Sequence, residues 1–306
     1  VHTAALKWID EQTDGTPLFL YLHTLNPHNP YSPPEPYPGR FSSDDQSAID
    51  GQTETLTAIQ DLELTPTAPD REKIRGLYAA NLAYNDAELC ALVDEIETRH
   101  PGEAMVVVTS DHGEELFDHG GVRHGYTLYD ELIHVPLVVW WPGRIAPRRI
   151  DRLSGTLDLH ATLRDLVGSP AAVQSGPGRS LWAAMAGLSG GAEAPQVQFA
   201  VAPGLRNGVM ARSHNWKLIL TPRPRFEWGM GRGPGRTHEA EYVFDLERDP
   251  GELVNLAGSS SVEVDWLRTR LQRWWALWAA LQPEQAESTE IDRETRRQLE
   301  ALGYVE

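Results

Sequence analysis

One apolar run that ends abruptly in polar residues constrains the fold of this chain more than any other segment. Residues 105–108 are Met-Val-Val-Val, and residues 109–113 continue as Thr-Ser-Asp-His-Gly. Such runs are typical of interior strands in a parallel sheet that is covered on both faces. Ligands of open α/β sheets bind beyond the carboxyl ends of these strands. The run therefore predicts an α/β fold with a polar site at the end of this strand.

The segments around this strand extend the α/β pattern. Residues 17–23 and 134–141 are short apolar runs bounded by glycine or proline, and we expect both to form buried strands. Residues 71–99 and 156–167 carry apolar residues at helical spacing. Helices that alternate with strands predict a mixed or parallel sheet flanked by helices. We expect this α/β part to occupy residues 1–190.

The pattern changes after a stretch rich in Gly, Ala and Ser at residues 186–195. Short strand runs follow near residues 196–202, 207–213, 216–221 and 241–245. Turns rather than helices separate these runs, which is typical of an antiparallel sheet. Residues 261–282 and 290–302 predict helices after the sheet. We expect residues 191–306 to form a small subdomain of antiparallel sheet with a C-terminal helix.

Composition and charge bound the possible functions. The net charge of −17 argues against a nucleic-acid partner, because phosphate backbones attract surfaces rich in Lys and Arg. No apolar run is as long as the roughly 18 residues that a transmembrane helix needs. The single cysteine, Cys90, excludes an internal disulfide, and its helical spacing predicts a buried side chain. Residues 42–70 are acidic and lack periodicity, which favours a surface excursion.

Asp111 and His112 are candidate metal ligands. Neighbouring side chains on a strand point to opposite faces, so this pair can meet at one ion only where the strand breaks into a loop. Gly113 makes that break easy. A carboxylate and an imidazole suit Ca²⁺, Mg²⁺ or Mn²⁺ and tolerate Zn²⁺. The alternative is that Asp111 caps the following turn and His112 is an ordinary polar residue.

Two further histidines are candidates for the same site. His28 lies in Asn-Pro-His-Asn-Pro-Tyr after the predicted strand at residues 17–23, and His124 lies on the path from Asp111 to the next strand. A positioned histidine can protonate a leaving oxygen or bind an oxyanion. The alternative for His28 is a proline-rich surface loop with an incidental histidine. His119 could also reach the site, or brace the loop.

Three segments together resemble the sulfatases, a family of the alkaline-phosphatase-like superfamily. The first is Leu-Tyr-Leu-His with Asn-Pro-His-Asn-Pro-Tyr at residues 20–31. The second is Val-Thr-Ser-Asp-His-Gly-Glu at residues 108–114, and the third is His-Gly-Tyr-Thr-Leu-Tyr-Asp-Glu with Val-Pro-Leu at residues 124–137. Weaker similarities continue in order along the chain, for example Trp-Lys-Leu-Ile at residues 216–219. The resemblance implies an alkaline-phosphatase-like α/β fold.

The resemblance also implies roles for the candidate residues. Asp111 and His112 match a pair of metal ligands, usually to Ca²⁺, and many members have asparagine where His112 stands. His28 matches the histidine that contacts the sulfate ester. His124 falls where many members have a substrate-binding lysine, and a protonated imidazole could still pair with a sulfate oxygen. The implied activity is metal-dependent hydrolysis of a small-molecule or saccharide sulfate ester.

The resemblance places the nucleophile outside this chain. In sulfatases a formylglycine, made within a Cys-x-Pro-x-Arg or Ser-x-Pro-x-Arg signature, lies upstream with two further metal-binding aspartates. Cys90 is followed by Ala-Leu-Val and does not match. We therefore expect an incomplete fragment of a sulfatase that is inactive by itself. One alternative is a phosphoester or phosphonate monoester hydrolase of the same superfamily. Another is a truncated pseudo-enzyme that binds sulfated ligands without turnover.

Overall fold

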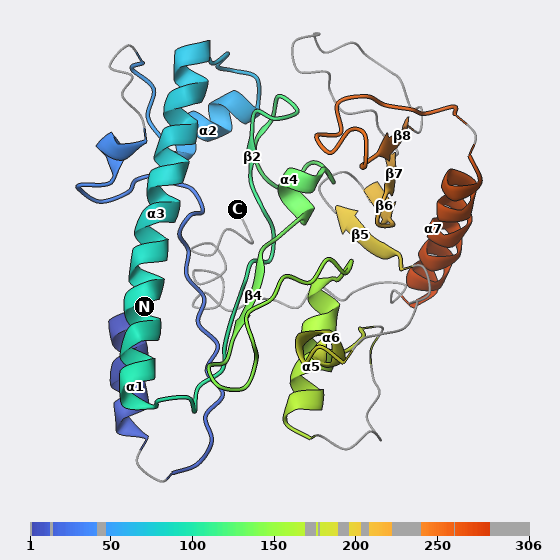
Figure 1. Cartoon of the computed structure of the whole chain (residues 1–306). Helices are drawn as coiled ribbons and strands as arrows, with labels where there is room; N and C mark the ends of the chain where they lie inside the picture. The colour runs from blue at the N-terminus through green and yellow to red at the C-terminus, as the bar shows by residue number, and fades with distance from the viewer. Residues whose placement is uncertain are drawn as a thin grey trace. The chain divides into compact units, whose positions relative to one another are not determined.

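A helix of 32 residues, α3 (Ala68–Arg99), is the longest element among the described residues (Figure 1). The structure is a computed structural model that describes residues 2–12, 15–41, 47–168, 176, 178–188, 196–202, 208–221, 240–259 and 261–281. Its contacts divide the chain into two units. The first unit comprises Val1–Thr57, Thr65–Leu92 and Trp274–Glu306, and the second comprises Ala58–Leu64 and Val93–Arg273. The predicted boundary at residue 190 stays a prediction.

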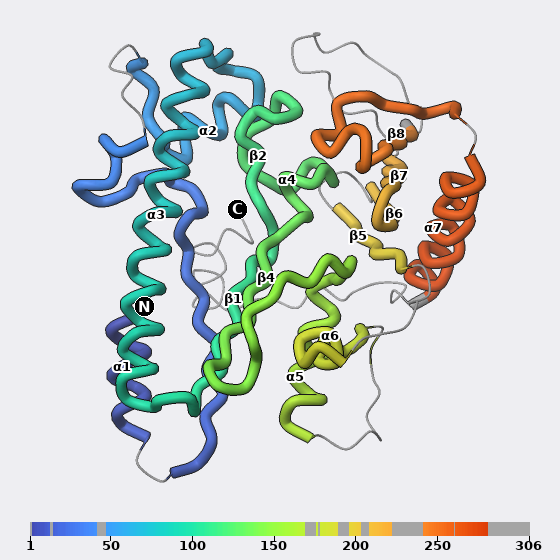
Figure 2. The backbone as a smooth tube through the Cα atoms, in the orientation of Figure 1, coloured from blue at the N-terminus to red at the C-terminus, as the bar shows by residue number. Residues whose placement is uncertain are grey.

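The first unit contains α3 as far as Leu92, and α3 confirms the helix predicted at residues 71–99. The helix α1 (His2–Glu11) runs beside α3 (Figure 2), and His2 Nδ1 lies 3.6 Å from a carboxylate oxygen of Glu88. A short 3₁₀ helix, η1, covers Pro38–Arg40. The buried ring of Tyr31 packs edge-on against Tyr78 of α3, with 5.5 Å between ring centroids. This aromatic pair fixes the proline-rich loop against the helix.

Three predictions for the first half of the chain are wrong. Residues 17–23 form no strand in the described structure, and Phe19 and Tyr21 are 77% and 75% exposed. An apolar run becomes a strand only where another strand supplies hydrogen-bond partners, which the run itself does not encode. The expected surface excursion contains helix α2 (Thr53–Gln60), and Leu56 of α2 is fully buried. Cys90 is exposed rather than buried.

The N-terminus of α3 is held by a capping carboxylate. Asp70 accepts hydrogen bonds from the backbone N–H of Thr67 at 2.8 Å and from the hydroxyl of Ser47 at 2.6 Å. These bonds favour the ionised carboxyl, and the largest contribution, from Ser47, lowers the pKa of Asp70 below its ordinary value of 3.8. Asp70 therefore stabilises the fold above that value, and this stabilisation is lost as the pH falls through the lower pKa of the folded state.

We expect Asp70→Asn to lower the free energy of unfolding at neutral pH by about 0.3–1 kcal/mol, because the amide still accepts hydrogen bonds but lacks the negative charge that the helix N-terminus favours. The difference from the unsubstituted protein should shrink as the pH falls below 3.8, because the unsubstituted carboxyl is then protonated as well. Urea unfolding measured between acidic and neutral pH checks both expectations. Asp86→Asn, on the exposed side of α3, is the matched control. An equal loss for both variants would contradict the capping role.

In the second unit the predicted metal-binding strand is β1 (Val106–Thr109), which pairs with β4 (Leu137–Trp140). The pairing is antiparallel, with Val107 opposite Val139. The parallel arrangement predicted for this strand is therefore wrong for the neighbour that the described structure shows. An apolar run indicates burial but not the direction of its partner. The chain passes from β1 to β4 through the short pair β2 (Glu115–Leu116) and β3 (Val122–Arg123) and the one-turn helix α4 (Asp130–Ile133).

The antiparallel sheet predicted for the C-terminal part is confirmed. Its strands are β5 (Gln198–Ala202), β6 (Gly208–Arg212), β7 (Trp216–Thr221) and β8 (Ala240–Asp245), paired in chain order. Helices α5 (Thr156–Leu166) and α6 (Trp182–Met185) precede the sheet and α7 (Val262–Leu281) follows it. The helix predicted at residues 290–302 lies outside the described residues. Among the described residues, no helix is long and apolar enough to span a membrane.

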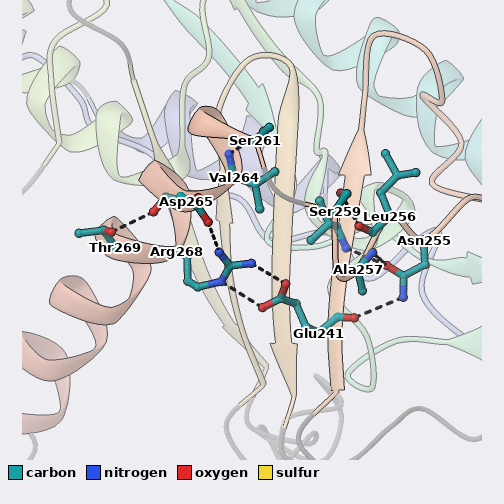
Figure 3. Close-up of polar contacts among 11 residues, drawn as sticks. Glu241, Asn255, Leu256, Ala257, Ser259, Ser261, Val264, Asp265, Arg268 and Thr269 are labelled. Atoms are coloured by element: carbon teal, nitrogen blue, oxygen red, sulfur yellow. Dashed lines mark hydrogen bonds and ion pairs between the residues drawn. The ribbon is translucent and has the colours of Figure 1, made fainter.

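A charged contact joins α7 to the last strand. Both oxygens of the Glu241 carboxylate on β8 accept from Arg268 of α7, at 3.2 Å from Nε and 2.7 Å from the terminal nitrogen (Figure 3). Asp265, one turn earlier on α7, accepts a hydrogen bond of 2.5 Å from the other terminal nitrogen of Arg268. Two parallel hydrogen bonds between a guanidinium and a carboxylate set direction as well as distance. The pair therefore sets how the first half of α7 meets the sheet.

Candidate active site

The loop after β1 is held by the carbonyl groups of helix α4. The backbone N–H of Gly113 donates to Leu132 O at 2.8 Å, and that of Glu114 donates to Glu131 O at 3.0 Å. A Cβ atom at position 113 would lie 2.0 Å from Glu131 O, so no larger residue fits without a backbone shift. The glycine is thus required by a close approach of two backbones. The loop and α4 form one hydrogen-bonded unit.

Within this loop the side chains of Asp111 and His112 turn toward each other. His112 Nε2 lies 3.8 Å from Asp111 Oδ2, and the backbone N–H of His112 donates to Asp111 Oδ1 at 3.1 Å. His112 Nδ1 lies 2.7 Å from the carbonyl oxygen of Gly113. A carbonyl only accepts, so this contact is a hydrogen bond in the tautomer that carries its proton on Nδ1 and has its lone pair on Nε2. The Asp111 side chain remains 52% exposed.

The pair fits part of a metal site. An imidazole nitrogen and a carboxylate oxygen are atoms that a divalent cation binds, and a carbonyl on the far ring nitrogen is the usual support of a histidine ligand. Among the residues that the structure describes, no group of three or more His, Cys, Asp or Glu side chains is placed to hold an ion. Hard cations take six or more ligands. Asp111 and His112 can therefore supply two ligands of a larger set.

His124 lies against this pair. Its ring stacks on that of His112, with 4.1 Å between the ring centroids and 27° between the planes. Its Nδ1 atom lies 2.9 Å from Oε1 of Glu114, whose side chain is only 4% exposed. In the sequence Glu114 follows closely after Asp111 and His112, the candidate metal ligands. Nothing in the sequence indicates that Glu114 contacts His124. The contact depends on β2 and β3 returning the chain to the loop, and only the fold shows this.

The interpretation of His119 as a brace agrees with its contacts. Its Nδ1 atom lies 2.6 Å from Oε1 of Glu131, and its Nε2 atom lies 3.1 Å from the carbonyl oxygen of Glu252. Its ring stacks face to face on Tyr129, with 3.7 Å between centroids. Both ring nitrogens are thus engaged by neighbouring residues. His119 links the loop to α4 and to the turn that contains Glu252.

A buried cluster of charged residues contacts α4 through Asp130. The sequence pattern did not predict this cluster. Lys217 of β7 is fully buried, and its Nζ atom lies 2.9 Å from Asp130 Oδ1 and 2.7 Å from Glu252 Oε1. The second oxygen of Glu252 accepts the backbone N–H of Asp130 at 2.7 Å, and Arg212 of β6 lies 3.1 Å from Asp130 Oδ2. Burial raises the pKa of the Glu252 carboxyl, and the Lys217 charge opposes that shift.

His28 lies in the first unit, whereas Asp111, His112 and His124 lie in the second. The His28 Nδ1 atom lies 2.7 Å from the carbonyl oxygen of Asn29, so this ring also presents Nε2. The Asn29 side chain donates to the hydroxyl of Thr53 at 3.1 Å. The loop of His28 is therefore an ordered, hydrogen-bonded segment.

One stretch matches the letters of the nucleophile signature, contrary to the expectation that this chain has none. Residues 175–179 read Ser-Gly-Pro-Gly-Arg. Ser175 and Pro177 lie outside the described residues. The backbone N–H of Arg179 donates to Asp158 of α5 at 2.7 Å, and a Cβ on Gly178 would lie 2.1 Å from Leu157 O. These contacts show a segment that packs against α5, and the match follows the metal pair in sequence instead of preceding it.

Comparisons with known proteins agree with the resemblance. The sulfatase family model matches residues 1–169. Arylsulfatase A of Bos taurus is 26% identical over 266 residues, which cover 82% of this chain and 46% of that protein. Arylsulfatase K of Xenopus laevis is 27% identical over an alignment of 308 positions, which covers 88% of this chain and 54% of that protein. The chain thus spans about half the length of these relatives.

A solved structure shows the same fold. The phosphonate monoester hydrolase of Agrobacterium radiobacter superposes with a TM-score of 0.65 at 20% identity, covering 96% of this chain and 62% of that one. The likeness confirms the predicted alkaline-phosphatase-like fold, whereas the predicted mixed or parallel sheet is not present among the described strands, whose pairs are antiparallel. Since the family model covers more than half of the residues, this chain belongs to the sulfatase family.

Proposed function

We propose that the protein to which this chain belongs hydrolyses sulfate esters with the help of a divalent metal ion. The observation that carries the proposal is the group formed by Asp111, His112 and His124. In this group a carboxylate and two stacked imidazoles, both supported at Nδ1, lie together at the end of β1. Membership of the sulfatase family supports the same chemistry. Ca²⁺ is the expected ion, with Mg²⁺ or Mn²⁺ as alternatives.

The residues of this chain would bind and orient the ester. Asp111 Oδ and His112 Nε2 would hold the ion, which supplies Lewis-acid stabilisation of the charge on the ester oxygens. His124, when protonated, would donate its Nε2–H to another of those oxygens. His28 would donate a proton to the leaving oxygen or bind an oxyanion. The nucleophile, expected to be a formylglycine, would come from outside the residues assigned here.

Hydrolysis of a phosphoester or phosphonate monoester is the second candidate. The fold likeness to a phosphonate monoester hydrolase is the observation that favours it. An Asp-His metal pair stabilises negative oxygens on phosphorus as well as on sulfur, so the described groups do not separate the two reactions. Turnover separates them.

The test compares three substrates on the complete protein. We expect kcat/KM for an aryl sulfate to exceed that for the matching aryl phosphate and aryl phosphonate by at least about tenfold, which corresponds to 1.4 kcal/mol of transition-state stabilisation. The reverse order would assign the second candidate. Binding of a sulfated sugar without any turnover would favour the non-catalytic alternative. We expect the 306-residue chain alone to show no turnover, and appreciable hydrolysis of an aryl sulfate by it would contradict this.

A further inference from the structure

We propose that Glu114 is a positioning residue that acts through His124, an inference that rests on the proposed function. Its side chain is only 4% exposed and its carboxylate lies 2.9 Å from His124 Nδ1. A carboxylate buried to this degree is stable only where it accepts hydrogen bonds from a fixed partner. The ring of His124 is that partner in the described structure. The contact therefore supplies a hydrogen-bond donor to the buried Glu114 carboxylate and holds the ring of His124.

The backbone of Glu114 is anchored independently of His124. Its N–H donates to Glu131 O at 3.0 Å, and the preceding Gly113 donates to Leu132 O. The carboxylate is thus carried on the same hydrogen-bonded unit as the metal pair. The Glu114 carboxylate therefore holds the His124 ring at a fixed position relative to Asp111 and His112.

Two contacts together define the orientation of the His124 ring. Oε1 of Glu114 lies within hydrogen-bond distance of Nδ1, and the ring of His112 stacks on one face at a centroid distance of 4.1 Å. An imidazole donates and accepts only in its plane, so both its direction and its tautomer must be set before it can serve a substrate. Glu114 sets both the direction and the tautomer of the His124 ring, because Nδ1 faces the buried carboxylate and Nε2 points away from it.

The neighbouring Glu115 offers a matched comparison. It is also buried, but its carboxylate accepts the hydroxyl of Thr127. Its backbone belongs to β2, directly after the loop. A change at Glu115 therefore reports the cost of disturbing a buried carboxylate whose hydrogen bond is to Thr127 and not to His124.

The test is a double-mutant cycle on kcat/KM for the aryl sulfate in the complete protein. We expect Glu114→Leu, which has no acceptor, to lose about 10- to 100-fold, as is usual for partners that orient an active-site imidazole. Glu114→Gln should recover most of this loss, because its amide oxygen still accepts from Nδ1. Adding Glu114→Leu to His124→Ala should cause no further loss, whereas Glu115→Gln should multiply with His124→Ala. Multiplicative losses for Glu114→Leu would overturn the proposal.

A second measurement needs no activity and uses the 306-residue chain itself. Long-range proton–nitrogen NMR on ¹⁵N-histidine protein distinguishes the two ring nitrogens of His124, assigned through His124→Gln. We expect a protonated Nδ1 in the unsubstituted chain and in Glu114→Gln, and a change in the Nδ1 signal in Glu114→Leu. An unchanged signal would refute the positioning role even if the protein proves to be a sulfatase. The expected change without sulfate turnover would keep the positioning role and refute the sulfatase function.

Discussion

Asp111→Ala should abolish both the Ca²⁺-dependent stabilisation of the complete protein and its hydrolytic activity. Asp111 is one of the two side chains proposed to hold the ion, and its carboxylate oxygen lies 3.8 Å from Nε2 of His112. A bound ion stabilises the folded state by about 2.7 kcal/mol at a concentration 100 times its Kd. Thermal unfolding with and without Ca²⁺, alongside a turnover assay, measures both effects.

Asp118→Ala is the control for this prediction. Asp118 is an exposed carboxylate in the same region, and its side chain accepts from the backbone N–H of Leu116 at 3.3 Å. We expect this variant to keep the Ca²⁺ response and the activity. If Asp111→Ala kept its Ca²⁺ response, the ion would bind elsewhere. Titrations with Mg²⁺ and Mn²⁺ on the unsubstituted protein identify which ion stabilises it most.

Lys217→Met should cause the largest loss of stability among single substitutions in the C-terminal sheet. Removing this fully buried ammonium leaves the carboxylates of Asp130 and Glu252 without their shared cation. Breaking a buried ion pair from one side typically costs about 3–5 kcal/mol, because the remaining charge stays buried. Urea unfolding at neutral pH measures the change.

The exposed Lys7 is the control for the buried lysine. Its side chain is 79% exposed and lies 4.0 Å from Glu11, so Lys7→Met removes a solvated ion pair. Such pairs contribute about 0–1 kcal/mol. Similar losses for Lys7→Met and Lys217→Met would show that the buried cluster contributes little to the folded state.

Secondary structure was largely predictable from the sequence, because periodicity reports which face of an element is buried. The helix at residues 71–99 and the strands near residues 196–245 are confirmed by α3 and by β5 to β8. Strand direction and strand existence were less predictable. Val106–Thr109 pairs antiparallel, and residues 17–23 remain outside any strand in the described structure. Both properties depend on a neighbour that lies elsewhere in the chain.

The candidate site was predictable to the extent that its residues lie close together in sequence. Asp111 and His112 are adjacent, and the glycine after them indicates the loop that lets both side chains meet. The role of Glu114 was not predictable, because its partner His124 reaches it only through the return of β3. The Lys217 cluster joins residues up to 122 positions apart. No local pattern encodes a contact of that separation.

The position of α4 has a consequence for inherited and laboratory variation in this protein. Asp130, the first residue of this single helical turn, contacts the buried Lys217, and the carbonyl groups of the next two residues accept hydrogen bonds from the loop of Asp111. A damaging substitution in β7, or in the turn that contains Glu252, should therefore reduce the stabilisation of the protein by Ca²⁺. This reduction should occur although the proposed metal ligands are unchanged. Random mutagenesis scored by Ca²⁺ requirement should reveal a second group of sensitive positions in the C-terminal sheet.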